Sequence, residues 1–336
     1  MSNSRFCNRK DFSGGGSMVE HTSSYSKNKE NKMKKNNLLK KFLYSQKTAP
    51  YVFVLPFLLS FCIFWIYPFS STIVMSFQDI QPMGTKWIGL GNYRKLLADK
   101  VFLQAVGNSV MYMLLTLVLL IPFPLLFASL LDSRLVKAKG VWKALLYIPS
   151  LTSVVISGTL FRMMFSERDG SQFNLILNFF GHGKIQWLKM YPTAYFALLL
   201  IACWRWTGVN MLYFLSGLKS IDTGLYESAE IDGATGWQKF MYVTIPMLRP
   251  TLIYVLTISI YAGLAMFLES FMLWGNSSPY NIGTTIVGYL YRRGIEKNQM
   301  GYASAVGLVL LIIALVINMI QLVLSGTFKK EESVLL

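Results

Sequence analysis

The chain contains few of the side chains that metal centres and disulfide scaffolds require. Among its 336 residues there are only two histidines, His21 and His182, which are too few to build a histidine metal site. The three cysteines, Cys7, Cys62 and Cys203, are odd in number and far apart, so they offer neither a disulfide framework nor a zinc site with Cys-x-x-Cys spacing. We therefore expect no metal, no cofactor and no disulfide scaffold.

Catalytic motifs are missing as well. No Gly-x-x-x-x-Gly-Lys-Ser/Thr run is present to bind nucleotide phosphates, because Gly183-Lys184 lacks both the upstream glycine and the following hydroxyl. A nucleophile elbow, paired histidines and a zinc motif are also missing. We predict that the chain is not an enzyme, has no catalytic residues and does not hydrolyse ATP.

Charged residues are scarce as well. Charged residues make up 14% of the chain and hydrophobic residues 53%, and the mean hydropathy is +0.43. This composition is too apolar for an ordinary soluble domain and predicts a membrane protein. Half of the formal net charge of +16 lies in residues 1–49, which hold eleven Lys/Arg and three Asp/Glu. The tail and the rest of the chain therefore need separate explanations.

Long apolar stretches predict six membrane spans. About 20 apolar residues in a helix cross the hydrocarbon of a bilayer, and a barrel strand would instead alternate over about ten residues, which none of the stretches does. The chain is thus predicted to be an all-α integral membrane protein with a transmembrane domain at 50–328. The predicted spans cover residues 51–77, 105–131, 144–161, 190–218, 250–268 and 298–328.

The basic tail at 1–49 cannot bury a core and is predicted to be disordered. It is either a solvated leader or, as its lysines near the first span favour, a contact with anionic membrane lipid. Nucleic acid is not an expected partner, since no aromatic residue lies between the lysines of residues 32–41. Counting the tail, Lys and Arg predict that both termini, including the short tail at 329–336, are cytoplasmic.

The loop at 219–250 carries the strongest local signals. Asp222 or Thr223 can cap a short helix that Asp232-Gly233 ends. Thr235 and Gln238 then form a capping box that opens a second helix, which we expect Pro246 to end. Residues 222–232 hold four carboxylates and no basic side chain, so this helix pair favours a protein partner over a lipid surface.

These residues resemble a known motif. The run Glu227-Ser228-Ala229, with Gly233 six positions after the glutamate and Ile245-Pro246 beyond, resembles the EAA loop of binding-protein-dependent ABC importer permeases. Ser228 stands where that pattern has its first alanine, which is a small-for-small change. The longer run at 226–234 is similar to the carbohydrate branch, the permeases of the maltose and glycerol-phosphate type, and the likeness extends at lower specificity over nearly all of residues 50–325.

The resemblance implies a fold, a function and partners. It implies the type I ABC importer permease fold, with six transmembrane helices and a cytoplasmic coupling-helix (EAA) loop, in a bacterial cell membrane. The chain would form half of the pathway of an ATP-driven sugar importer, with an oligosaccharide as the preferred substrate. The implied partners are a second, homologous permease, two ATP-binding subunits and an extracytoplasmic solute-binding protein. The implied ATPase-coupling residues are Glu227, Ser228, Ala229, Asp232, Gly233, Ile245 and Pro246.

Ionisable and aromatic residues within the spans are candidates for the substrate pathway. Arg205 is about twelve residues from either end of its span, about 18 Å of helix rise, and must therefore face protein or a wet cavity. It either lines the pathway or pairs with a partner subunit. Trp204 is a candidate for stacking on a sugar ring. Glu269 is a third candidate, although its position near a span end also suits a simple anchor at the interface.

Two other functions remain open at this point. An ion-coupled secondary transporter would use acidic residues within the membrane, for which Glu269 alone gives thin support. A membrane scaffold would use the acidic loop only to dock a soluble protein.

Overall fold

The computed structural model describes residues 48–327 except 82–83, 134–135, 169 and 276. The basic tail predicted at 1–49 and the C-terminal tail at 329–336 therefore lie almost wholly outside the described residues. The chain divides into two compact units, Met1–Ser70 and Ser71–Leu336, and each is described by itself.

The first predicted span is a helix throughout. It consists of α2 (Ala49–Phe61), a π-helical turn η1 (Cys62–Ile66) and α3 (Tyr67–Ser76). Together these elements form an apolar helix of 28 residues, which is long enough to cross a membrane. The span predicted at 51–77 is confirmed.

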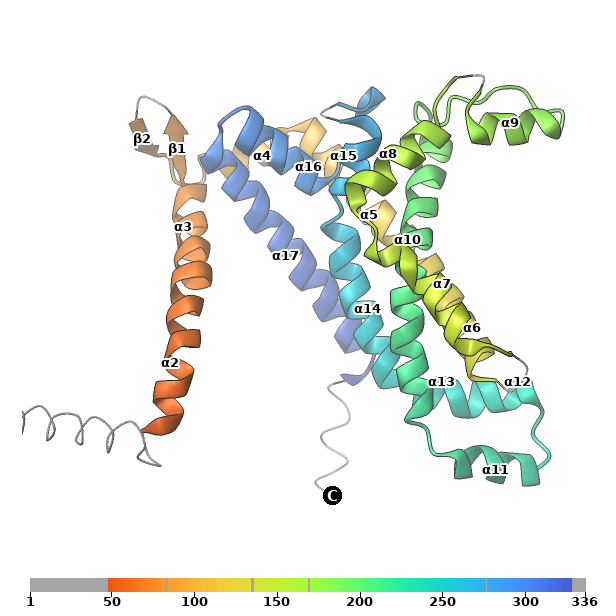
Figure 1. Cartoon of the computed structure of the whole chain (residues 1–336). Coiled ribbons are helices and arrows are strands. Elements are labelled where there is room, and N and C mark those ends of the chain that lie inside the picture. Colours follow the sequence, from red (N-terminus) through yellow and green to blue (C-terminus); the bar gives the residue numbers. More distant parts are fainter. Residues whose placement is uncertain (1–47, 82–83, 134–135, 169, 276, 328–336) are drawn as a thin grey trace, which may run out of the picture. The chain divides into compact units, whose positions relative to one another are not determined.

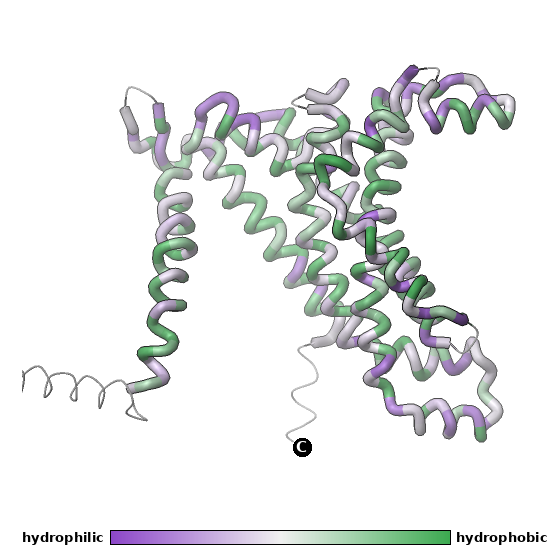
Figure 2. Tube along the Cα trace, in the orientation of Figure 1, coloured by the Kyte–Doolittle hydropathy of each residue, from purple (hydrophilic) through white to green (hydrophobic). Residues whose placement is uncertain are grey.

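In the second unit, four further predicted spans are long helical segments (Figure 1). Figure 2 shows hydrophobic residues along these helices and hydrophilic ones towards their ends. With the first span they form five described helices that could cross a membrane, and a bent helix pair makes the sixth. The remaining long elements are α5 (Lys100–Leu120) continued by α6 (Pro122–Asp132), α10 (Tyr191–Lys219), α14 (Arg249–Leu264) continued beyond a break by α15 (Leu268–Trp274), and α17 (Met300–Leu324).

The third span differs from the single helix expected at 144–161. The structure has α7 (Lys139–Leu151) and α8 (Val154–Met164), which meet at an angle of 92°. Hydroxyl side chains compete for the backbone at this point, since Ser150 Oγ donates to the Tyr147 carbonyl at 2.7 Å and Thr152 Oγ1 to the Pro149 carbonyl at 2.6 Å. The prediction of one straight helix was wrong because these local bonds, together with Pro149, end α7.

The fifth span is also broken. The helix expected over 250–268 ends at Leu264 in α14, and α15 resumes only at Leu268. Phe267, just before α15, has a non-helical backbone with φ −142°. Breaks of this kind are tolerated in a membrane where the backbone is buried in protein or lines a cavity.

Shorter elements gather at one end of the second unit, which we call the hairpin end. A two-stranded antiparallel sheet is the exception to the all-helical prediction, with Gln78 opposite Trp87 and Gln81 opposite Gly84. The elements at this end are β1 (Gln78–Gln81), β2 (Gly84–Trp87), α4 (Gly91–Ala98), α9 (Gln172–Phe179), η3 (Pro279–Asn281), α16 (Ile286–Tyr291) and η4 (Arg292–Glu296).

Helix α10 packs closely on the broken third span. At Gly208 a Cβ atom would lie 2.0 Å from the Leu146 carbonyl oxygen, so only glycine permits this approach of α10 to α7. Further along, Met211 and Phe214 of α10 are fully buried against side chains of α6 and α14. Helix α10 therefore forms the centre on which the neighbouring spans are placed.

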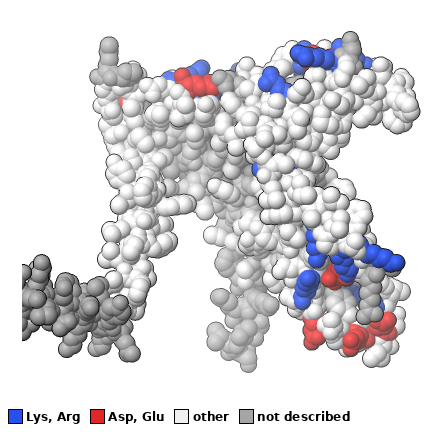
Figure 3. Space-filling model, viewed as in Figure 1, with Lys and Arg blue, Asp and Glu red and all other residues white. Residues whose placement is uncertain are grey.

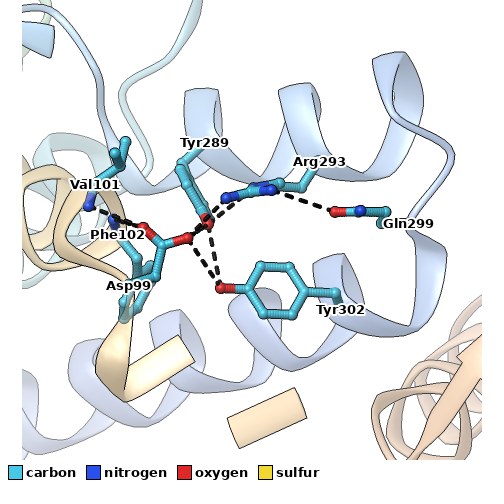
Figure 4. Close-up of polar contacts among 7 residues, drawn as sticks. All are labelled: Asp99, Val101, Phe102, Tyr289, Arg293, Gln299 and Tyr302. Carbon is cyan, nitrogen blue, oxygen red and sulfur yellow. Dashed lines mark hydrogen bonds and ion pairs between the residues drawn. The ribbon is translucent and has the colours of Figure 1, made fainter. Parts of the chain in front are cut away.

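A cluster of charged and phenolic side chains joins the elements of the hairpin end (Figure 4). The cluster consists of Asp99, Tyr289, Arg293 and Tyr302. Asp99 Oδ1 caps α5 by accepting from the backbone N–H groups of Val101 at 2.9 Å and Phe102 at 3.2 Å. Its Oδ2 accepts from Tyr289 Oη at 2.6 Å and Arg293 Nη2 at 2.7 Å.

Burial by itself would raise the pKa of Asp99, but hydrogen bonds from Tyr289 and the backbone, together with the charge of Arg293, lower it overall. The carboxylate of Asp99 is therefore held in its charged form and joins α5 to α16 and η4.

Candidate functional site

The end of the second unit opposite the hairpin end carries the two helices expected in the 219–250 loop. The first is α11 (Thr223–Ile231), and the second begins with α12 (Gly236–Lys239). We call α11 and α12 the helix pair. Asp222 is the cap of α11, because its Oδ1 accepts from the Gly224 N–H at 3.0 Å. Of the two residues predicted as possible N-caps of α11, Asp222 is the N-cap in the structure.

The turn between these helices explains the glycine at 233. The Ala234 N–H donates to the Ala229 carbonyl at 2.9 Å, and the Gly233 N–H donates to the Glu230 carbonyl at 3.0 Å. This pair of bonds is a Schellman motif, which needs a left-handed residue at the position of Gly233, and its φ is +77°. The predicted stop at Asp232-Gly233 is confirmed.

The second helix starts as expected but does not end as expected. The capping box of Thr235 and Gln238 is formed in both directions. Pro246, however, does not end the helix: α12 passes through a π-helical turn η2 (Phe240–Thr244) into α13 (Ile245–Met247) and then α14. A wider turn leaves room for a proline ring that would otherwise meet the carbonyl four residues back, which is why the prediction for Pro246 was wrong.

Few polar contacts hold the helix pair. The hydroxyls of Tyr226 and Thr244 are 2.9 Å apart and joined by a hydrogen bond, and an exposed ion pair links Lys239 Nζ to Glu230 Oε2 at 3.3 Å. Tyr226, Phe240 and Ile245 also pack against the core under α10.

The exposed surface of the helix pair is both acidic and apolar. Ile231 and Trp237, and Tyr242 of the adjoining turn η2, are 87%, 69% and 79% exposed, which is unusual for large apolar side chains. Figure 3 shows acidic side chains gathered at α11 with basic ones nearby. Among the predicted coupling residues, Glu227, Ser228, Asp232, Gly233 and Pro246 are exposed, whereas Ala229 and Ile245 are half-buried.

A cavity of about 550 Å³ lies between the spans. Its wall includes the start of α8, the middle of α10 and the broken region between α14 and α15. Apart from Glu269, the polar lining was missed from sequence, although an isolated polar residue within an apolar span was the available signal. It consists of Tyr112, Thr116, Asn210, Tyr213, Ser259 and Glu269, beside which Trp206 contributes an indole ring.

The three predicted pathway residues occupy different places. Glu269 is half-buried and lines the cavity. Trp204 is not among the lining residues; its ring lies edge-on to Phe161 at 5.4 Å. Arg205 is not among them either, and its guanidinium lies 5.6 Å from the ring centre of Trp206.

Polar side chains of α10 meet backbone carbonyls at the breaks in neighbouring spans. Arg205 Nη1 donates to the Thr152 carbonyl at 2.9 Å, where α7 ends, and Asn210 Nδ2 donates to the Leu120 carbonyl at 2.9 Å, where α5 ends. A carbonyl freed by a break needs such a donor within a membrane. Arg205 Nε is buried without a partner among the described residues. Arg205 thus makes an intrachain contact that the sequence did not predict.

Among the described residues, no three His, Cys, Asp or Glu side chains lie close enough together to hold a metal ion.

Comparisons with known proteins agree on one kind of molecule. The family model described as binding-protein-dependent transport system inner membrane component matches residues 125–330. The arabinooligosaccharides transport system permease protein of Bacillus subtilis (strain 168) is 48% identical over 288 residues, which are 86% of this chain and 92% of that protein.

Solved structures give the same picture. A bacterial ABC transporter involved in the import of the acidic polysaccharide alginate has a chain similar to this one, with a TM-score of 0.76 and 26% identity, covering 88% of this chain and 99% of that chain. A second structure, of the bacterial alginate ABC transporter in complex with an alginate pentasaccharide-bound periplasmic protein, matches with a TM-score of 0.74 and 25% identity over 88% and 98% of the two chains.

Proposed function

Because the chain belongs to the binding-protein-dependent transport system inner membrane components, as a carbohydrate ABC importer permease of type I fold, we propose that it carries a short arabinose-containing oligosaccharide. The relative from Bacillus subtilis supports this substrate, since the likeness covers nearly the whole of both proteins. The cavity of about 550 Å³ is within the usual range for small-molecule sites and combines aromatic with polar side chains, as a sugar requires.

The proposed assembly pairs this chain with a second permease, two ATP-binding subunits and an extracytoplasmic solute-binding protein. The alginate importer, whose structure includes a periplasmic protein carrying a pentasaccharide, supports the last of these partners. In this arrangement the helix pair and both termini lie on the cytoplasmic side, and the hairpin end faces outward. The chain itself supplies half of the translocation pathway.

The observation that carries the coupling proposal is the surface of the helix pair. The helix pair is held by caps at three points. Its surface exposes four carboxylates and several large apolar side chains and makes few contacts with its own chain. We assign to Glu227 a polar contact with an ATP-binding subunit, to Ala229 a close-packing position and to Gly233 the turn, with Ser228, Asp232, Ile245 and Pro246 around them. ATP-driven movement of that subunit then moves the helix pair, and the spans alternate between their inward-open and outward-open arrangements.

Two glycines in this loop allow a matched test. A Cβ atom would have no neighbour within 4 Å at either Gly233 or Gly236, but only Gly233 has a positive φ. Gly233→Val forces a branched side chain into the left-handed region at a cost of about 1–2 kcal/mol, which distorts the turn. We expect sugar-stimulated ATPase activity and uptake in the reconstituted complex to fall severalfold, and Gly236→Val to stay near the unsubstituted level.

Equal uptake in the two variants would contradict the assignment of the helix pair to coupling. The ion-coupled alternative has no support among the compared proteins, and uptake by this chain in vesicles without ATP or partners would be needed to revive it. The scaffold alternative predicts weaker docking in Gly233→Val with no change in sugar flux.

A further inference from the structure

Helix α9, in the segment between the third and fourth spans, has an apolar face that no described residue covers. Leu175, Ile176, Phe179 and Phe180 are 52%, 53%, 85% and 70% exposed. Ile176 and Phe179 are three residues apart and Leu175 and Phe179 four, so these side chains lie on one face of α9, and Phe180 directly follows the helix. The two phenylalanines alone expose on the order of 300 Å², an area that marks an interaction site on an otherwise folded surface.

The opposite face of α9 fixes the helix to the spans. The ring of Phe173 stacks on that of Phe165 with centroids 4.2 Å apart and planes 5° apart. Asn174 Oδ1 accepts from Trp187 Nε1 at 2.9 Å, and both residues are buried. The uncovered face therefore belongs to a helix whose other face is packed firmly against the spans.

These contacts also set the depth of α9. Trp187 packs against Phe196 with ring centroids 6.0 Å apart. Phe196 lies five residues inside α10, about 7.5 Å of helix rise from the start of that span. Helix α9 thus lies level with the first turns of α10, where a span passes from headgroups into hydrocarbon. Figure 1 shows α9 beside that end of α10, extending away from it.

Charge around α9 is arranged as lipid headgroups require. Arg168, Lys184 and Lys189 are exposed on the connections on either side of α9, and Lys189 Nζ pairs with Glu167 Oε2 at 2.9 Å. In the view of Figure 3, basic side chains gather on the upper side of this segment, and the surface below them towards the spans is uncharged. Cations above and apolar side chains below match the order of phosphates and acyl chains in a leaflet.

We propose that α9 lies in the membrane interface, with its apolar face among the acyl chains of the leaflet at the hairpin end. A soluble protein that docks and leaves would expose the four side chains to water between encounters, whereas lipid covers them permanently. The helix holds the ends of α8 and α10 at a fixed depth. The proposal needs only the membrane placement of the chain and is independent of the substrate and of the coupling assignment.

The test uses environment-sensitive probes in the full complex. Cys7, Cys62 and Cys203 are replaced by serine, and an NBD fluorophore is attached at Phe179→Cys or, as the matched control one residue away, at Asn178→Cys. The complex is reconstituted in nanodiscs of phosphatidylcholine and phosphatidylglycerol. We expect lipids with a doxyl quencher high on the acyl chain to quench the probe at 179, and aqueous iodide to quench it about fivefold less than the probe at 178.

A third probe at Ile176→Cys, one turn earlier on the same face, should repeat the pattern of position 179. Strong iodide quenching at 179 and 176 would overturn the proposal because the face would be in water. Protection from both quenchers would overturn it in favour of a covering subunit, and protection that appears only when solute-binding protein is added would overturn it in favour of a docking surface.

Discussion

The two ends of the second unit are built on opposite principles. At the hairpin end, the cluster of Asp99, Tyr289, Arg293 and Tyr302 joins elements that lie about 190 residues apart in the chain, and its hydrogen bonds are short. At the other end, one hydroxyl contact and a few packed side chains join the helix pair to the rest of the unit, and the exposed ion pair of Glu230 and Lys239 only links its two helices to each other.

The hairpin end is therefore stabilised by contacts within the chain, whereas the helix pair has few such contacts. In the cluster of the hairpin end, the carboxylate of Asp99 and the guanidinium of Arg293 pair within the chain. The helix pair leaves its carboxylates and its large apolar side chains exposed and has few contacts with the rest of its own chain. Substitutions at the two ends should therefore have different consequences for the isolated chain.

The largest effect is expected from breaking the charge cluster. Arg293→Ala leaves the carboxylate of Asp99 partly buried without its cation, because the two side chains are only 26% and 18% exposed. We expect a loss of about 2 kcal/mol in the free energy of unfolding, measured by thermal unfolding in detergent. Asp99→Ala should cost a similar amount, and the double variant less than the sum of both.

Lys297→Ala is the control for that experiment, since Lys297 is exposed in the same segment. It should change stability by less than about 0.5 kcal/mol. Additive effects of Asp99→Ala and Arg293→Ala would mean that the two ends do not differ in the way described.

A smaller effect is expected at the helix pair. Tyr226→Phe removes the hydroxyl that meets Thr244, which should cost about 1 kcal/mol and only locally. Amide hydrogen exchange in α11 should become faster while the melting temperature of the chain stays the same. Tyr242→Phe, at a position 79% exposed, should leave both measurements unchanged. A lowered melting temperature in Tyr226→Phe would show that this end is tied into the global fold.

The smallest expected effect is the pH dependence of stability that Asp99 contributes. The pKa of Asp99 is below its usual value of 3.8, so its charged form contributes stability above that pH and the contribution is lost as the pH falls further. We expect the melting temperature of Asp99→Asn to fall less than that of the unsubstituted chain between pH 5 and about pH 3. Glu296→Gln, an exposed control, should follow the unsubstituted chain.

Much of the fold could be predicted because the signals are local. The uncharged stretches gave the spans at 51–77 and 298–328, and the capping box and Gly233 gave the helix pair. In each case the deciding residues are neighbours in the chain, so spacing alone identifies them.

Other features depend on contacts between distant residues. The breaks at Thr152 and Ala265 lie in apolar stretches that look like continuous helices in the sequence. At the first break, the Thr152 carbonyl accepts a hydrogen bond from Arg205, which lies 53 residues away in the chain. The cavity lining comes from several helices, and for that reason Asn210 and Thr116 were missed, whereas Trp204, a predicted pathway residue, does not line this cavity. The charge cluster was not foreseen for the same reason.

The continuity of the chain through Pro246 has a mechanical consequence. Backbone hydrogen bonds run from the Leu248 N–H to the Thr244 carbonyl at 2.9 Å and from the Leu252 N–H to the Leu248 carbonyl at 2.8 Å, so the ladder crosses the junction between α13 and α14. Leu248 is fully buried at this junction. A flexible tether here would absorb displacement, whereas the hydrogen-bonded backbone should transmit a displacement of α12 to α14, which forms one wall of the cavity.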